Sequence, residues 1–189
     1  MNSEKIKQSI LDSARVIESM CLKADTISTI CRCVVDSLKS GGKILTAGNG
    51  GSAAEALHMS EELVGRFRGN RISLPAVALV ADTTALTCIA NDFGYDQVFG
   101  RQIEGLARAG DVLVLFSSSG NAKNLEIAAR TAAQRGIKTI CFLGRDGGRL
   151  AGKGDFEIII DHTQTERIQE AHQVLLHIVL DAVEEEFKN

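Results

Sequence analysis

Residues 43–62 read KILTAGNGGSAAEALHMSEE and combine three local patterns. The short apolar run 44–47 is typical of a buried strand. The turn 48–52, Gly-Asn-Gly-Gly-Ser, interrupts this run, and its glycines allow the backbone to approach a ligand closely. Residues 53–63 are rich in Ala, Glu, Leu and Met, which favour a helix. Strand, glycine turn and helix in this order place backbone N–H groups and a positive helix end at a sheet edge, where an anion can bind.

The helix expected after this turn carries two residues whose side chains can take part in catalysis or metal binding. His58 and Glu62 are four residues apart, so the same helical face carries both side chains. Such a pair also occurs on solvated helices, and glycine turns occur in α/β proteins that bind no ligand. The combination of turn and pair on one helix favours a functional site.

Composition excludes several classes of protein. The 189 residues suit one domain, and the net charge of −3 without a long basic run argues against a nucleic-acid partner. No apolar run approaches the roughly 20 residues of a membrane span. The polar start, MNSEKIKQS, does not read as a signal peptide. Five cysteines, an odd number, are expected to be free thiols, which together with these features predicts a cytoplasmic protein without a membrane partner.

Strands and helices alternate along most of the chain. Helices are expected over 3–20 and 27–38, then strands at 44–47, 75–80, 111–116, 138–143 and 156–160. Helices are expected between the strands at 52–66, 82–91, 98–107 and 125–135, and a last one at 166–187. This order predicts an α/β fold with a doubly wound, five-stranded parallel sheet flanked by helices.

The first two helices are expected to form an N-terminal helical hairpin, residues 1–40, within the same domain as the sheet portion, residues 41–189. The faces of the sheet are already flanked by helices. We therefore expect this hairpin to pack partly against another subunit.

A second polar turn follows the strand at 111–116. Ser117, Ser118 and Ser119 precede Gly120 and a helix, and ligands of such sheets bind outside the carboxyl ends of the strands. Neutral hydroxyls and a helix N-terminus suit a phosphate monoester. The lysine of a nucleoside-triphosphate loop is missing, which argues against such a ligand. The alternative is an ordinary turn with capping serines.

The last helix carries a polar stripe on an otherwise apolar pattern. Gln169, Gln173 and His177 follow at intervals of four, and His172 lies among them. Together with His58 and Glu62 they offer a mixed nitrogen and oxygen site for a divalent metal such as Zn²⁺. The alternative is a set of solvated or interface residues, since the sequence does not show that the two helices meet.

Four segments together resemble a known family: AGNGGSAAEALHMSEEL (47–63), ANDFGYDQVF (90–99), DVLVLFSSSGN (111–121) and ERIQEAHQVLLH (166–177). They are similar to the sugar-isomerase (SIS) domain family and, within it, to the phosphoheptose isomerases, over nearly the whole chain. The turns are shared by phosphosugar binders of many activities. HMSEEL and RIQEAH-x₄-H narrow the resemblance to the isomerases.

The resemblance implies an SIS fold and an aldose–ketose isomerase. Its reaction would convert D-sedoheptulose 7-phosphate to D-glycero-D-manno-heptose 7-phosphate, the first step of nucleotide-activated heptose synthesis for lipopolysaccharide core or capsule. It further implies a homotetramer with active sites at subunit interfaces and one Zn²⁺ per subunit. The implied metal ligands are His58, Glu62, Gln169 and His177, with Glu62 and His177 as the acid–base pair. The implied substrate-binding residues are Asn49, Gly50, Gly51, Ser52, Glu62, Asn91, Asp92, Ser117, Ser118, Ser119 and Gln169.

Isomerisation through an enediol(ate) requires a base at carbon and an acid–base group at the oxygens. The hypothesis is that Glu62 takes the carbon proton and that His177 manages ring opening and the oxygen protons. Two departures from the family pattern are Ala122, where a phosphate-contacting Ser is usual, and Glu166, where Asp is frequent.

The alternative is a non-catalytic SIS protein. Such a protein would sense a phosphosugar or bind a protein, as does the SIS protein that binds the bacterial replication initiator DnaA. That relative lacks the histidine at the position of His177. Retention of His58, Glu62 and His177 together favours the enzyme.

Overall fold

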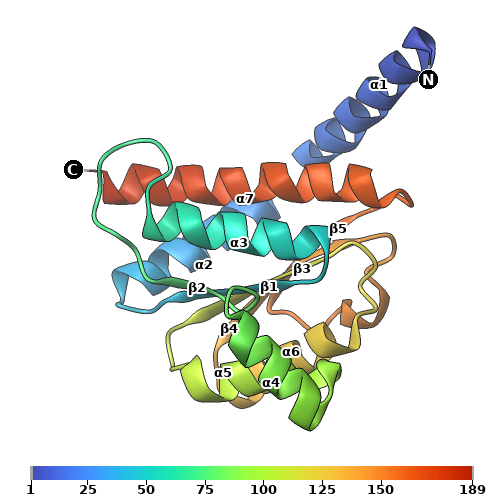
Figure 1. Ribbon diagram of the computed structural model, residues 1–189. Helices are drawn as coiled ribbons and strands as arrows, with labels where there is room; N and C mark the ends of the chain where they lie inside the picture. Colours follow the sequence, from blue (N-terminus) through green and yellow to red (C-terminus); the bar gives the residue numbers. More distant parts are fainter. Residues whose placement is uncertain (1, 189) are drawn as a thin grey trace.

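Five parallel strands form a single sheet in the computed structural model, which describes residues 2–188 (Figure 1). The strands are β1 (Ile44–Gly48), β2 (Ala76–Ala78), β3 (Val112–Ser117), β4 (Lys138–Gly144) and β5 (Phe156–Ile160), in the spatial order β2-β1-β3-β4-β5. The helices are α1 (Ser3–Ser19), α2 (Ala24–Lys39), α3 (Gly51–Val64), α4 (Thr83–Phe93), α5 (Gly100–Leu106), α6 (Lys123–Gln134) and α7 (Thr165–Phe187). The expected α/β architecture is confirmed. The outer limits of the expected segments 1–40 and 41–189 lie outside the described residues.

Both faces of the sheet are covered by helices, which explains the unbroken apolar run of β3. Val112, Val114 and Phe116 point into a core shared with α2, α3 and α7. Leu113 and Leu115 point to the opposite side, into a core shared with α5 and α6. Each fully buried aliphatic side chain stabilises the fold by about 1.5–3 kcal/mol.

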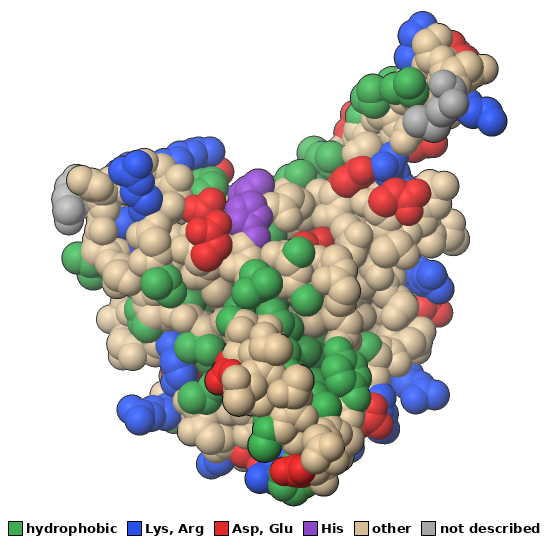
Figure 2. Space-filling view, viewed as in Figure 1, with side chains coloured by type: hydrophobic (Ala, Val, Ile, Leu, Met, Phe, Trp, Pro, Cys, Tyr) green, Lys and Arg blue, Asp and Glu red, His purple; other side chains and the backbone are tan. Residues whose placement is uncertain are grey.

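The N-terminal helices are present, but they do not lie side by side as a hairpin. Met20–Lys23 form a 3₁₀ turn, η1, so the chain stays helical instead of reversing between α1 and α2. Consequently α1 projects from the body and α2 lies beneath α7 (Figure 1). Three apolar side chains of α1 remain about half exposed, Ile6 at 44%, Ile10 at 63% and Leu11 at 53%, and Figure 2 shows apolar side chains along this helix.

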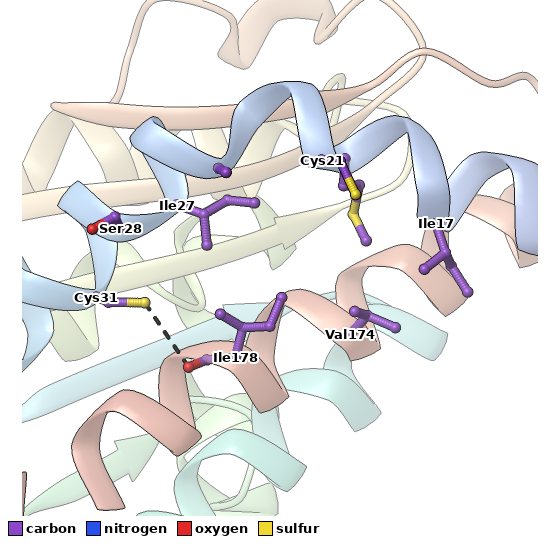
Figure 3. A pocket seen from close by; sticks show the side chains of 9 residues that line it. Ile17, Cys21, Ile27, Ser28, Cys31, Val174 and Ile178 are labelled. Carbon is purple, nitrogen blue, oxygen red and sulfur yellow. Dashed lines mark hydrogen bonds between the residues drawn. The ribbon is translucent and has the colours of Figure 1, made fainter. Parts of the chain in front are cut away.

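An apolar cavity of about 430 Å³ lies where these helices meet α7. Ile17, Ile27 and Cys31 line it from the N-terminal helices, and Val174 and Ile178 line it from α7 (Figure 3). The Cys31 thiol donates to the carbonyl oxygen of Ile178 at 3.9 Å, so α2 is also held to α7 by a polar contact.

Two boundaries differ from those expected. The helix expected to end at residue 91 continues as α4 to Phe93 and ends only at Gly94, whose φ of +85° breaks the helix. The strand expected at 75–80 is shortened to β2, because only Ala76–Ala78 pair with β1 at this edge of the sheet. Asp82 caps the start of α4, since its side chain accepts from the Ala85 N–H at 2.9 Å.

No helix within residues 2–188 is long and apolar enough to cross a membrane.

Candidate active site

The two polar turns meet where the strand order reverses. β1 and β3 are neighbours in the sheet, but the chain leaves them toward different sides, and ligands of open α/β sheets bind at such a point. A small cavity of about 80 Å³ lies there. Its lining comes from both turns and their flanking residues: Asn49, Ser52, Phe116, Ser117, Ser118, Ser119, Ala122 and Leu125.

The serine hydroxyls of the second turn are oriented by the backbone. The Gly120 N–H donates to Ser117 Oγ at 3.1 Å, and the Asn121 N–H donates to Ser119 Oγ at 3.2 Å. Each hydroxyl then keeps its own hydrogen for a ligand. The cavity lies beside the first turn of α6, and no lysine lines it. Convergent neutral donors at a helix N-terminus suit a phosphate monoester.

Asn49 is held by two residues that sequence reasoning missed. Asn49 Nδ2 donates to Asn124 Oδ1 at 2.9 Å, and Asn124 Nδ2 donates back to Asn49 Oδ1 at 2.9 Å. The Tyr95 hydroxyl donates to the same Asn49 oxygen at 2.9 Å. Asn124 is buried, and its place on α6 gave no sequence signal, because the contact crosses 75 residues.

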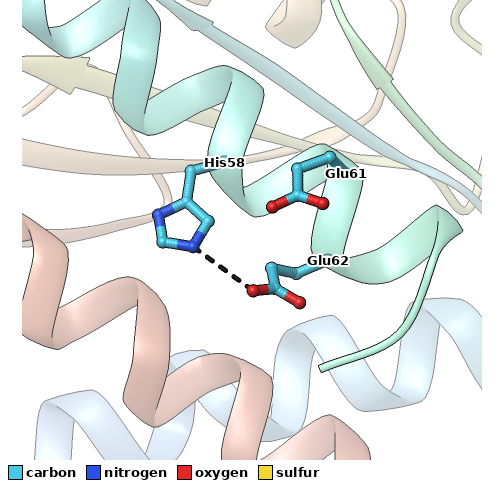
Figure 4. A group of neighbouring side chains, drawn as sticks. All are labelled: His58, Glu61 and Glu62. Atoms are coloured by element: carbon cyan, nitrogen blue, oxygen red, sulfur yellow. Dashed lines mark ion pairs between the residues drawn. The ribbon is translucent and has the colours of Figure 1, made fainter. Parts of the chain in front are cut away.

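The second part of the site is formed by α3 and α7, which pack against each other. The rings of His58 and His177 are 5.2 Å apart between centroids and nearly perpendicular, at 82°. The Gln173 amide nitrogen lies within hydrogen-bonding distance of His58 Nδ1 and 3.5 Å from His177 Nε2. His58 Nε2 is 3.4 Å from Glu62 Oε1 (Figure 4). The structure therefore brings together His58, Glu62 and His177, the point that the sequence left open.

These groups are partly exposed, and histidine side chains reach the surface beside acidic ones between the C-terminal end of α7 and α1 (Figure 2). The pKa of His177 is lowered from its ordinary value, chiefly because burial penalises the charged imidazolium and also because His58 adds a like charge. Glu62 acts in the opposite direction but does not outweigh them. The imidazole of His177 is therefore neutral at neutral pH and is able to accept a proton or bind a metal.

The donor set fits a divalent cation. Ligand atoms of His58, Glu61 and Glu62 lie within 4.8 Å of one another, and the His177 ring faces them from α7. Imidazole nitrogens with carboxylate oxygens are the donors that zinc accepts. Glu61 was not foreseen, and it is the exposed member of the group.

Gln169 lines a larger cavity of about 520 Å³ that extends from the glycine turn to His58. This cavity is lined by Ser13, Ile17, Gly51, Ala54, Glu55, His58, Gln169, Glu170 and Gln173. Gly51 is adjacent in sequence to Ser52, which lines the small serine cavity, so neighbouring residues of the first turn line the two cavities. Residues Ser13 and Ile17 bring α1 to the rim of the site.

Two of the expected substrate residues lie elsewhere in this chain. Asn91 and Asp92 are exposed at the end of α4, and Asn91 Nδ2 donates to Asp92 Oδ1 at 2.7 Å. Neither lines either cavity. Gly50 is exposed at the start of α3 with a φ of +59°, a conformation that favours glycine and that turns the chain into the helix.

Comparison with known proteins agrees with this geometry. The family model of the SIS domain matches residues 10–144. The phosphoheptose isomerase of Nitratiruptor sp. is 46% identical over 188 residues, which cover 97% of this chain and 99% of that protein. The chain belongs to the SIS-domain family of phosphoheptose isomerases.

Solved structures of this family share the architecture. The phosphoheptose isomerase of Neisseria gonorrhoeae is 38% identical, with a TM-score of 0.89 over 96% of this chain and 98% of that chain. The phosphoheptose isomerase of Francisella tularensis is 29% identical, with a TM-score of 0.93 over 98% and 100%. The structural similarity to these two proteins therefore covers nearly the whole chain, including α1 and α7.

Proposed function

We propose that this protein is an aldose–ketose isomerase that converts D-sedoheptulose 7-phosphate to D-glycero-D-manno-heptose 7-phosphate. The observation that carries the proposal is the convergence of His58, Glu62 and His177 from two helices. A serine cradle at the ends of β1 and β3 is formed by Ser52, Ser117, Ser118 and Ser119, and no lysine lines its cavity. The cradle suits the phosphate monoester, and the cluster supplies groups able to move protons.

The reaction moves a hydrogen between C1 and C2 and shifts the carbonyl in the opposite direction. We assign Glu62 as the base that removes the C1 proton of the open-chain ketose and returns it to C2. His177, neutral at neutral pH, transfers the proton between the two oxygens and assists ring opening. Ser52, Ser117, Ser118 and Ser119 hold the phosphate, so that the sugar extends toward the histidines.

We further propose one Zn²⁺ per subunit, held by His58, Glu62, Gln169 and His177. A bound divalent cation would supply positive charge where negative charge develops on the enediolate oxygens. Glu62 then has two tasks that compete, because a carboxylate that binds a metal is a weaker base. Its partly exposed position on α3 leaves the side chain room to serve them in turn.

The proposed assembly is a homotetramer in the cytoplasm with active sites at subunit interfaces. Its support is physical: the half-exposed apolar side chains of α1 and the apolar cavity beside α7 leave surface that a second copy would cover. Asn91 and Asp92, which do not reach the cavities of their own chain, are proposed to contact substrate in a neighbouring subunit. The product would feed nucleotide-activated heptose synthesis for lipopolysaccharide core or capsule.

A non-catalytic phosphosugar sensor, or a module that binds a protein partner such as DnaA, is less well supported. It would not require two histidines and a carboxylate from two helices to lie next to one another.

The test is a coupled assay with sedoheptulose 7-phosphate as substrate. Wild-type protein is expected to turn over, and Glu62→Gln and His177→Gln are expected to lose about 10²–10⁴-fold in kcat while remaining folded. Turnover by Glu62→Gln at the wild-type rate would refute the assignment of the base. Absence of turnover by wild type, with the sugar phosphate still bound, would instead favour the sensor.

A further inference from the structure

A buried ion pair closes the loop that follows α3. Residues 65–75 leave the helix at Gly65 and return at Leu74, whose N–H donates to the carbonyl oxygen of Leu63 at 3.0 Å. Within this loop the Arg71 side chain is only 1% exposed, and its Nε lies 3.2 Å from Glu184 Oε2 on α7. The other oxygen of Glu184 accepts from the Gly69 N–H. We call this arrangement the Arg71–Glu184 clasp.

The same guanidinium also binds the end of the helix that carries the site. Arg71 Nη2 donates to the carbonyl oxygen of Glu62 at 2.6 Å, and Nη1 donates to that of Leu63 at 2.9 Å. These carbonyls belong to the last turn of α3, where helical partners are missing. A cation at this position also complements the negative end of the helix dipole. The backbone of Glu62 is therefore fixed by a side chain that touches neither cavity.

The loop contributes directly to the wall of the site. The Phe67 ring stacks on the His177 imidazole, at 5.8 Å between centroids and 23° between planes. Phe67 lies four residues before Arg71, so its position depends on the closure of the loop. One clasp thus sets the backbone of Glu62 on α3 and the aromatic neighbour of His177 on α7.

We infer that Arg71 and Glu184 are positioning residues, which hold Glu62 and Phe67 in register with the two histidines. This inference rests on the proposed function. The serine cradle lies at the ends of β1 and β3 and contacts no member of the clasp. Weakening the clasp should therefore lower kcat and leave the KM for the sugar phosphate nearly unchanged, because misplacement by about 1 Å typically costs about 10²-fold.

Two conservative variants test the inference. Arg71→Lys keeps the positive charge but cannot bind Glu184 and both helix carbonyls at once, since an ammonium lacks the planar fork of a guanidinium. Glu184→Gln keeps the shape and an acceptor for Gly69. The matched control is Glu186→Gln, also on α7, which removes the ion pair with Lys39. Both side chains of this pair are about half exposed, Lys39 at 50% and Glu186 at 49%.

Two readouts are compared well below the melting temperature. Both clasp variants are expected to lose about 10–100-fold in kcat with KM within about 3-fold. In hydrogen exchange followed by mass spectrometry, amides of residues 59–75 should exchange faster in these variants, whereas those of β3 should not. Glu186→Gln should match wild type in both readouts.

Faster exchange with a wild-type kcat would overturn the positioning role, and unchanged exchange in Arg71→Lys would overturn the clasp itself. The proposed function is tested separately, because wild-type turnover is measured first. If wild type does not turn over the substrate, the proposed function fails. The exchange rates then still decide whether the clasp holds the end of α3.

Discussion

Replacement of Gly51 by alanine tests the position of Gln169 with little effect on the fold. A Cβ atom at residue 51 would lie 2.1 Å from Gln169 Nε2, whereas ordinary contact begins at 3.4 Å. The amide must therefore retreat by at least 1.3 Å, the difference between these two distances. The atom that must move is the end of a flexible side chain, so the backbone is expected to stay in place.

The expected effects on stability and activity differ in size. Alanine is favoured over glycine in a helix by up to about 1 kcal/mol, and an off-rotamer Gln169 costs about 0.5–1.5 kcal/mol. These contributions nearly cancel, so the melting temperature should change by no more than roughly 4 °C. A misplacement of about 1 Å in a positioned group, in contrast, costs about 10²-fold in rate.

The assay measures kcat and KM with sedoheptulose 7-phosphate, together with thermal unfolding. The control is Gly105→Ala in α5, where a Cβ meets nothing within 4 Å, and wild-type activity is expected. Gln169→Ala completes a double-mutant cycle: in its background Gly51→Ala should have no further effect, because the clash is gone. Wild-type kcat/KM in Gly51→Ala, or losses that add in the double variant, would refute the reasoning.

Three further predictions follow from the same site and fold. Ala122 is the N-cap of α6, makes no side-chain capping hydrogen bond and lines the serine cavity. Ala122→Ser should therefore stabilise the fold by about 1 kcal/mol and lower the KM for the sugar phosphate, and a higher KM would contradict this. Treatment with a chelator should lower both turnover and melting temperature, because a cation bound only by the native state stabilises it, and added Zn²⁺ should restore both. Burial would raise the pKa of Asp155, but hydrogen bonds from Lys138 Nζ at 2.8 Å and the Thr139 N–H at 2.9 Å outweigh it and lower this pKa from its ordinary value. The pKa of Asp155 is lower in the folded than in the unfolded protein, so the carboxylate stabilises the fold above about pH 4, and this stabilisation is lost on further acidification. In urea unfolding, the difference in free energy of unfolding between wild type and Asp155→Asn should therefore shrink below about pH 4.

The sheet and its turns were predictable because their signals are local. Apolar runs of four to six residues alternate with helical patterns, and parallel order follows from the short connections. The meeting of the Gly48–Ser52 and Ser117–Asn121 turns then follows from topology alone, since the carboxyl ends of neighbouring parallel strands share one edge. The resemblance to the family rested on the same segments, and family membership agrees with it.

Contacts between helices gave no such signal. Whether His58 and His177 meet depends on how α3 and α7 pack, and the sequence contains only the polar stripe on each helix. The pair of Asn49 with Asn124, and the hydroxyl of Tyr95 on the same oxygen, join segments 46 and 75 residues apart. The projecting α1 was also unforeseen, because the 3₁₀ turn Met20–Lys23 and a short hairpin loop look alike in sequence.

α3 sets the spacing between the two halves of the site. Its first turn supplies Ser52 to the serine cavity, and six residues later it supplies His58, a rise of about 9 Å along the helix. Glu62 lies a further turn along, but its carboxylate is directed back toward His58, as helical side chains lean toward the N-terminus. The distance between the serine cradle and the proposed base Glu62 is therefore set by the number of residues that separate Ser52 from Glu62 on one rigid helix. If the serines bind the phosphate and Glu62 is the base, as proposed, a sugar phosphate too short to span this rise should bind without reaching Glu62, and we therefore expect the protein to discriminate substrates by chain length.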